Sequence, residues 1–279
     1  MSEEGFVKEE IIEEEVEEEL EDEEEEELEV VKEVIEEITE IVEETDETIE
    51  EEQEVEEEPV VKESAPWIFF DYSGTLVDTI NALSRAYTRF LGKEFPQDRV
   101  KSLYKDYPKM NNLAIMRKYK LNPLKYLAGG KDKFEEIRKE EFMTGVRAYP
   151  GIQEVLLRLQ KMNIAKLAIL THETELEDEE ERERILQHFA IPNVFEVAIT
   201  DIKNKEEAFK LFIEKNPVSF GIIISDMQFD LDIGKRNNLK TIGVSWGFST
   251  RDELDGDHVI GDPRELLQVI VNLMHQREI

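Results

Sequence analysis

Short apolar runs alternate with amphipathic segments along most of the chain after residue 66. Apolar runs of this length are typical of strands that are buried on both faces of a parallel sheet. They predict strands at residues 67–70, 166–170, 197–200, 221–224, 241–244 and 258–260. Apolar residues three and four positions apart predict helices between them, at residues 152–162, 179–189, 206–214 and 264–275. This alternation predicts an α/β fold, a doubly wound, Rossmann-like core with a parallel sheet and right-handed crossovers.

Residues 79–147 interrupt the alternation. Helical spacing recurs at residues 80–91, 113–119 and 134–142, and prolines and a Gly-Gly pair separate these segments. We therefore predict a small α-helical insertion after the first strand. The α/β core would then comprise residues 66–78 and 148–279, a size that suits one hydrophobic core with an insertion.

The first 65 residues differ from the rest in charge. They hold 34 Asp or Glu residues against three Lys, a net charge of −31 out of −34 for the whole chain. A segment this charged buries too little apolar surface to repay its ordering entropy. We predict an acidic low-complexity tail that is mostly disordered. A second interpretation is a narrow amphipathic helix that docks on a partner, because aliphatic residues between Leu28 and Ile49 recur at heptad spacing.

Composition excludes several classes of protein. The chain has no cysteine, which excludes disulfides and thiolate metal sites. No apolar run is long enough to cross a bilayer and no signal-peptide pattern opens the chain, so we expect a cytoplasmic protein without a membrane partner. The acidic tail disfavours nucleic acid as a partner, because it repels phosphates.

Three polar motifs follow predicted strands. The segment WIFFDYSGTLVDT places Asp71 after the first strand and ahead of Gly74 and Thr75. Thr171 ends the strand LAIL, and the segment FGIIISDMQFD places Asp226 after a strand and Asp230 four residues later. Because the carboxyl ends of parallel strands meet at one edge of the sheet, we expect these side chains to form one site.

In this order, the motifs resemble those of the haloacid dehalogenase-like hydrolase superfamily over residues 66–279, and the chain's end resembles its phosphoglycolate phosphatase-type branch. The resemblance implies a magnesium-dependent phosphohydrolase that acts on a small phosphorylated metabolite through an aspartyl phosphate, with residues 79–147 as a helical cap. It implies Asp71 as the nucleophile, and Thr171 and Lys205 as catalytic residues that bind the phosphoryl group together with Gly74 and Thr75. It places Mg²⁺ on Asp71, the carbonyl of Ser73, Asp226 and Asp230. Lys203 is an alternative to Lys205.

Ser73 departs from the family pattern, which resembles Asp-x-Asp-Gly-Thr. The second Asp of that pattern protonates the departing alkoxide and then helps to activate water, and a serine does neither at neutral pH. The loss of such a general acid slows proton transfer by roughly 100- to 10,000-fold. We therefore predict a slow or selective enzyme that favours acyl and aryl phosphates, whose leaving groups depart unprotonated.

Other functions remain open on the sequence alone. Dehalogenases of the superfamily also lack the second Asp, but they work without a metal and do not need the pair formed by Asp226 and Asp230. A non-catalytic phosphate-binding or scaffold protein is the main alternative, with the acidic tail binding a partner. Residues 79–147 carry a net charge of +8. The tail's partner would therefore be either a basic protein or the chain's own cap.

Overall fold

A computed structural model describes residues 65–122, 130–201 and 204–276. The predicted acidic tail, apart from residue 65, and the alternative lysine Lys203 lie outside the described residues. None of the helices in the described part of the chain combines the length and the hydrophobicity that a membrane span requires.

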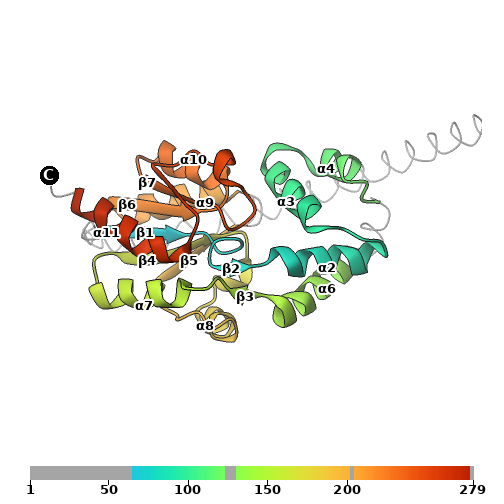
Figure 1. The fold of residues 1–279 in the computed structure, drawn as a ribbon, viewed down its shortest axis with the longest axis horizontal. Coiled ribbons are helices and arrows are strands. Elements are labelled where there is room, and N and C mark those ends of the chain that lie inside the picture. The colour runs from blue at the N-terminus through green and yellow to red at the C-terminus, as the bar shows by residue number, and fades with distance from the viewer. Residues whose placement is uncertain (1–64, 123–129, 202–203, 277–279) are drawn as a thin grey trace, which may run out of the picture. The chain divides into compact units, whose positions relative to one another are not determined.

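A six-stranded parallel sheet forms the centre of the fold (Figure 1). Its strands stand in the order β5-β4-β1-β6-β7-β8. Their bounds are β1 (Ala65–Phe70), β4 (Lys166–Thr171), β5 (Val197–Thr200), β6 (Val218–Ser225), β7 (Lys240–Val244) and β8 (His258–Ile260). The order reverses direction between β1 and β6, where neighbouring loops leave the sheet on opposite sides. The predicted α/β class and parallel sheet are confirmed.

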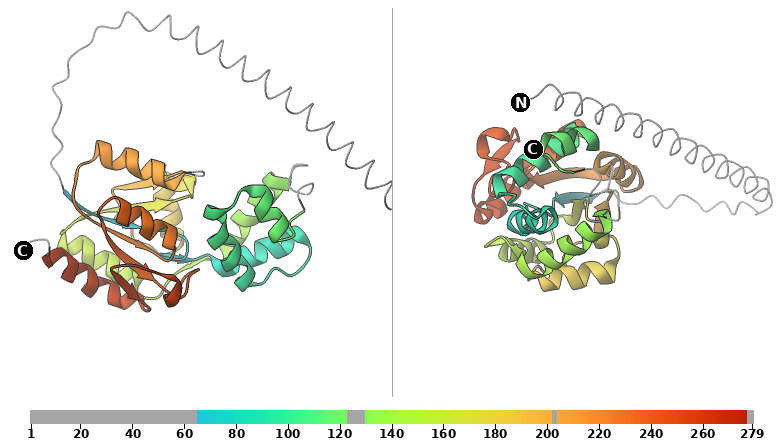
Figure 2. Two further views of the ribbon diagram at one scale, coloured as in Figure 1. Left: turned by 90° about the horizontal axis from the view of Figure 1, so that it is seen from above. Right: turned by 90° about the vertical axis from the view of Figure 1, so that its right-hand side faces the viewer.

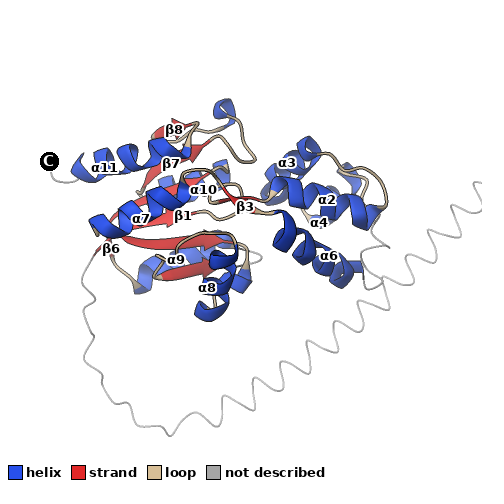
Figure 3. Cartoon of the chain, turned by 60° about the horizontal axis from the view of Figure 1, so that its bottom comes forward, coloured by secondary structure: helices blue, strands red, loops and turns tan. Residues whose placement is uncertain are grey.

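Helices cover both faces of this sheet (Figure 3). One face packs against α7 (Ile152–Met162), α8 (Glu179–His188) and α11 (Leu266–Gln276), and the other packs against α9 (Lys205–Lys215) and α10 (Gln228–Arg236). Successive side chains of β1 divide between the two layers, since Ile68 and Phe70 join the first and Trp67 and Phe69 join the second. This division explains why the strand is apolar at every position.

A short antiparallel ladder marks the two ends of the helical insertion. It pairs β2 (Val77–Asp78) with β3 (Arg147–Ala148). Between these strands lie α2 (Ile80–Leu91), α3 (Gln97–Asp106), the 3₁₀ turn η1 (Tyr107–Lys109), α4 (Asn112–Lys118) and α6 (Gly130–Gly145) (Figure 2). These helices share a hydrophobic cluster in which Phe134 packs against Tyr87 and Phe90. Phe248, which follows β7, also belongs to this cluster.

Three 3₁₀ turns follow strands of the sheet. They are η2 (Thr174–Leu176) after β4, η3 (Arg251–Glu253) after β7 and η4 (Pro263–Glu265) after β8. The last of these explains why α11 begins at Leu266, two residues later than the predicted helix start. The division of the chain into domains stays a prediction.

Candidate active site

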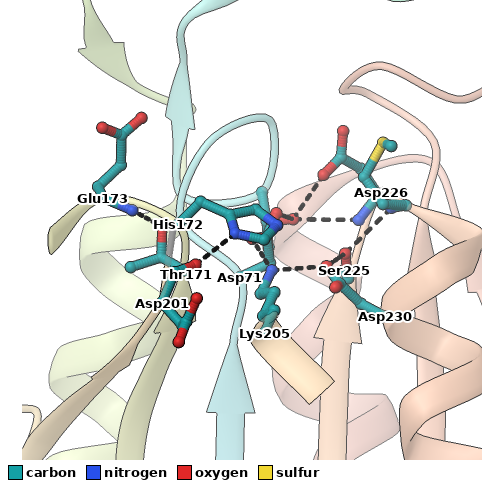
Figure 4. A network of polar contacts seen from close by, with 11 residues as sticks. Asp71, Thr171, His172, Glu173, Asp201, Lys205, Ser225, Asp226 and Asp230 are labelled. Carbon is teal, nitrogen blue, oxygen red and sulfur yellow. Dashed lines mark hydrogen bonds and ion pairs between the residues drawn. The ribbon is translucent and has the colours of Figure 1, made fainter. Parts of the chain in front are cut away.

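Asp71 directly follows β1 at the carboxyl edge of the sheet. Its N–H donates to the carbonyl of Ile224 in β6 at 2.9 Å, which anchors the residue to the ladder. The chain then turns tightly, and Gly74 takes a φ of +89° that side-chain-bearing residues rarely adopt. The Asp71 side chain is buried, and both of its oxygens have partners. Oδ1 accepts from Lys205 Nζ at 2.7 Å (Figure 4). Oδ2 accepts from Thr75 Oγ1 at 3.3 Å.

Thr75 joins Asp71 to a second buried carboxylate, Asp226, which follows β6. The Thr75 hydroxyl lies 3.0 Å from Asp226 Oδ1 and accepts from the Asp226 N–H at 3.1 Å. The other oxygen, Oδ2, accepts from the N–H of Phe248 at 2.6 Å. Thr75 and Asp226 are both fully buried. Thr75 therefore contacts the two carboxylates, and its predicted contact with a substrate stays a prediction.

Two glycines leave the space that Asp226 needs. A Cβ on Gly74 would lie 2.3 Å from Asp226 Oδ2, and one on Gly247 would lie 2.2 Å from the same oxygen. Distances below 3.0 Å do not occur at real Cβ atoms. The Gly74 position in the predicted motif therefore has a steric explanation in addition to its turn geometry.

Lys205 opens α9 and extends to the carboxyl edge of the sheet. Its ammonium lies between two carboxylates, 2.7 Å from Asp71 Oδ1 and 2.9 Å from Asp230 Oδ2. Asp230, in the first turn of α10, also accepts from Ser225 Oγ at 2.7 Å. All three charged side chains are buried. The structure thus brings Lys205 to Asp71. The alternative, Lys203, lies outside the described residues, and the choice between the two lysines stays a prediction.

Burial and neighbouring charge perturb the three titrating groups differently. Burial raises the pKa of Asp71, although the charge of Lys205 opposes this. Burial, together with the charge of Asp71, raises the pKa of Asp226 well above its ordinary value. Burial by itself lowers the pKa of Lys205, but the charges of Asp230 and Asp71 outweigh it and the pKa is raised. The lysine therefore stays charged, while Asp71 and Asp226 repel one another.

This donor set fits Mg²⁺. Magnesium is usually held by one or two carboxylates, with water and phosphate oxygens completing its shell. The adjacent buried carboxylates of Asp71 and Asp226 supply that number. Within the described residues, no three acidic or histidine side chains are grouped to hold a metal. Asp230 is engaged by Lys205 and Ser225, and its predicted contact with a metal stays a prediction.

Ser73 is half-buried at the position where the family pattern has its second Asp. Its hydroxyl is buried and has no hydrogen-bond partner among the described residues. In the loop from residue 71 to residue 77 it is the one residue that is not classed as buried. The Ser73 hydroxyl is therefore a buried polar group whose hydrogen bonds the described residues leave unsatisfied.

Thr171 ends β4, the strand that pairs with β1 on the side away from β6. The Thr171 hydroxyl accepts from the N–H of Glu173 at 3.2 Å, which orders the loop after the strand. The adjoining His172 contacts the carbonyl of Asp201 through Nδ1 at 2.6 Å (Figure 4). The structure thus brings Thr171 to the same sheet edge as Asp71, but the recorded contacts within the described residues do not join the two side chains.

Several contacts at the site were not predicted from the sequence. Ser225 binds Asp230, and Trp246 Nε1 donates to the carbonyl of Thr75 at 3.1 Å. From the helical insertion, Lys101 Nζ donates to the carbonyl of Gly247 at 2.9 Å, beside the loop that holds Asp226. Ser225 is adjacent to a motif residue and was open to prediction. Lys101 carries no signal, because it is one of many lysines on the insertion.

Comparisons with known proteins bear on the family and the fold of the chain. A family model described as haloacid dehalogenase-like hydrolase matches residues 68–244. No curated protein matches the chain in sequence.

Solved structures share the fold. A hydrolase of the haloacid dehalogenase-like family from Streptococcus pneumoniae is 18% identical with a TM-score of 0.59, over 74% of this chain and 98% of that chain. A structure titled "a predicted phosphatase", from Clostridium acetobutylicum, is 19% identical with a TM-score of 0.59, over 76% of this chain and 100% of that chain. One titled "a predicted phosphoglycolate phosphatase", from Haemophilus somnus, is 18% identical with a TM-score of 0.54, over 74% and 98%.

Proposed function

Because this chain belongs to the haloacid dehalogenase-like hydrolase family, we propose that it is a magnesium-dependent phosphohydrolase in which Asp71 is the nucleophile. The observation that carries the proposal is the buried ion cluster at the carboxyl edge of the sheet. There the Lys205 ammonium lies 2.7 Å from Asp71, and Thr75 links Asp71 to Asp226. Substrates would be small phosphorylated metabolites.

The proposed reaction has two displacements. An oxygen of Asp71 attacks the phosphorus, the bond to the leaving oxygen breaks, and that oxygen departs with the bonding electron pair. Water then attacks the aspartyl phosphate, which releases inorganic phosphate and regenerates the carboxylate. Lys205 holds Asp71 in place and offsets negative charge on the phosphoryl oxygens, and the Thr171 hydroxyl and the turn amides around Gly74 bind those oxygens.

Asp71, Asp226 and the carbonyl of Ser73 would hold Mg²⁺. When bound, the ion supplies positive charge that stabilises the transferring phosphoryl group. The raised pKa of Asp226 supports this assignment, because a cation beside the two carboxylates would relieve their repulsion. We assign Asp230 the role of positioning Lys205, which it contacts at 2.9 Å.

The serine at position 73 limits the range of substrates. Its hydroxyl does not protonate a leaving alkoxide at neutral pH, so alkyl phosphates would react slowly. Aryl and acyl phosphates release anions that are stable without a proton. We therefore propose that the preferred substrates belong to these two classes.

Turnover of para-nitrophenyl phosphate tests the proposal. Release of para-nitrophenol should require Mg²⁺ and fall at least 100-fold in Asp71→Asn. Asp232→Asn is the matched control, since this carboxylate lies on α10 but bonds to Gln228 instead of the ion cluster. The control should keep wild-type turnover. Equal rates in wild type and Asp71→Asn would refute the assignment of the nucleophile.

A second variant tests the role of position 73. Ser73→Asp restores a group that is able to transfer a proton, and it should accelerate alkyl phosphate hydrolysis by roughly 100-fold or more. The gain on para-nitrophenyl phosphate should be much smaller, because that leaving group departs unprotonated. An equal gain on both substrates would contradict this explanation.

The same assays address the alternative of a non-catalytic phosphate-binding or scaffold protein, which the replacement of the family's second Asp by Ser73 favours. A scaffold would bind inorganic phosphate, and Lys205→Met would weaken that binding. It would show no magnesium-dependent turnover of either substrate.

A further inference from the structure

A cavity of about 770 Å³ lies between α6 of the helical insertion and α8 of the core. Its apolar lining includes Phe142 of α6, Leu176 of η2, Ile185 of α8 and Phe189, which follows α8. Met143, at its margin, is 46% exposed. Cavities of this volume with mostly apolar walls and a few polar groups are typical of small-molecule sites.

Tyr72 supplies one polar group of this cavity. The residue is only 3% exposed, and its hydroxyl has no hydrogen-bond partner among the described residues. Burial and then the charges of Glu173 and Glu175 raise the pKa of this hydroxyl, so it stays protonated. A buried hydroxyl without a partner is destabilising, and a ligand that bonds to it would remove that penalty.

Two carboxylates form the polar wall beside Tyr72. Arg138 contacts Glu173 Oε2 at 2.8 Å and Glu175 Oε1 at 3.5 Å, and Lys139 lies 3.7 Å from the same oxygen of Glu175. The second oxygen of each carboxylate has no ion pair or hydrogen bond within the described part of the chain. Arg138 also pairs with Glu135 at 2.8 Å, so its charge is shared among three carboxylates. The cavity is lined by three Lys or Arg and three Glu residues, so their formal charges balance. The wall nevertheless offers two acceptor oxygens that no donor among the described residues occupies.

We propose that this cavity binds a small organic ammonium compound with an aromatic or branched aliphatic body. The body would pack on the apolar lining between the two helices. The ammonium group would donate to the free oxygens of Glu173 and Glu175, and the hydroxyl of Tyr72 would bond to the polar end of the ligand. A charged donor strengthens such bonds. The Phe142 ring would pack on the body of the ligand, since the guanidinium of Arg138 already lies over this ring, 5.0 Å from its centroid.

This site is separate from the candidate active site, because Asp71, Thr171 and Lys205 do not line the cavity. Two short connections link them. Tyr72 directly follows Asp71, and the N–H of Glu173 donates to the Thr171 hydroxyl at 3.2 Å. Binding requires neither phosphate nor turnover, so this inference stands or falls independently of the proposed phosphohydrolase.

NMR titration of the full chain with 2-phenylethylamine tests the proposal. Saturable binding is expected, about fivefold tighter than that of 2-phenylethanol, because a charged donor replaces a neutral one. Phenylacetate, which has a similar body and the opposite charge, should not bind. Ethylammonium controls for general attraction to an acidic chain of net charge −34, and it should bind more weakly than the aromatic amine.

Matched variants locate the site. Tyr72→Phe and Glu175→Gln should each weaken 2-phenylethylamine binding by about two- to tenfold. Glu177→Gln should leave it unchanged, because Glu177 follows η2 but bonds to Thr200 and does not line the cavity. Both glutamates are near the surface, and circular dichroism would verify that each variant is folded. Absence of saturable binding, equal binding of phenylacetate, or equal effects of the two glutamate variants would overturn the proposal.

Discussion

Lys205→Met provides a direct test of how the ion cluster contributes to stability. Methionine keeps most of the side-chain volume, so the change removes the charge with little loss of packing. In the wild type the ammonium lies within 2.9 Å of both Asp71 and Asp230, and the three side chains are buried. Removing one partner of a buried ion pair destabilises a protein by about 3–5 kcal/mol, because the other charge is left uncompensated.

Urea denaturation at pH 7 without divalent metal would measure this loss. Lys210→Met is the matched control on the same helix, because its lysine is 57% exposed and lies 3.8 Å from Glu206. An exposed pair of this kind contributes about 0–1 kcal/mol. If Lys205→Met lowers the free energy of unfolding by less than about 1 kcal/mol, the described cluster is refuted, because loss of one partner of a buried ion pair costs more than this.

The pH dependence of the same variant provides a second measurement. Burial raises the pKa of Asp71 in the folded protein, and the charge of Lys205 opposes this. Removing that charge should therefore raise the pKa of Asp71 further. A carboxyl whose folded pKa exceeds its unfolded value is destabilising once the pH rises above the unfolded value of about 4. The penalty of Lys205→Met should therefore be largest at neutral pH and shrink on acidification. A penalty that grows as the pH falls would contradict this explanation.

Three further substitutions test individual contacts by chemical denaturation. Thr75→Val removes the hydroxyl that joins two buried carboxylates and should destabilise the protein by about 1–3 kcal/mol; an unchanged midpoint would argue against the bridge. Gly74→Ala should lower the stability of the protein by about 2 kcal/mol or more, because φ is +89° and the added Cβ would lie 2.3 Å from a carboxylate oxygen. Gly92→Ala is the control: φ is +70°, no atom lies within 4 Å of the added Cβ, and the loss of stability should be smaller. Burial raises the pKa of Glu141, but hydrogen bonds from two arginines outweigh it and hold the pKa below its usual value. Glu141→Gln should therefore destabilise the protein by about 1–3 kcal/mol at pH 7, and this loss should shrink as the pH falls through the lowered pKa of the wild-type carboxyl; a loss that does not change with pH would contradict the ion pairs.

The strands and long helices were predictable because their patterns are local. The prediction of a helix at residues 80–91 agrees with the observed bounds of α2, and that at residues 152–162 agrees with α7. The helix α3 was missed, since it buries only Val100 and Leu103. A helix with two buried apolar residues lacks the periodic stripe on which sequence reasoning depends.

The site was predictable only in part. Asp71, Thr171 and Asp226 each follow an apolar run, and strand ends meet at one edge of a parallel sheet. Sequence spacing did not reveal that Lys205 would lie between Asp71 and Asp230, because that contact depends on where α9 begins relative to α10. The cavity beside Tyr72 was equally hidden, because it is formed by side chains from α6 and α8 that are distant in the sequence.

The crowding around one oxygen of Asp226 limits which positions near the site tolerate substitution. Cβ atoms at Gly74 and Gly247 would each lie within 2.3 Å of that oxygen, so three chain segments converge there without spare volume. Ser73 is the one residue between residues 71 and 77 that is only half-buried, and its hydroxyl has no hydrogen-bond partner among the described residues. We therefore expect that substitutions adapting the proposed site to a different leaving group concentrate at position 73, while the glycines around Asp226 stay unchanged.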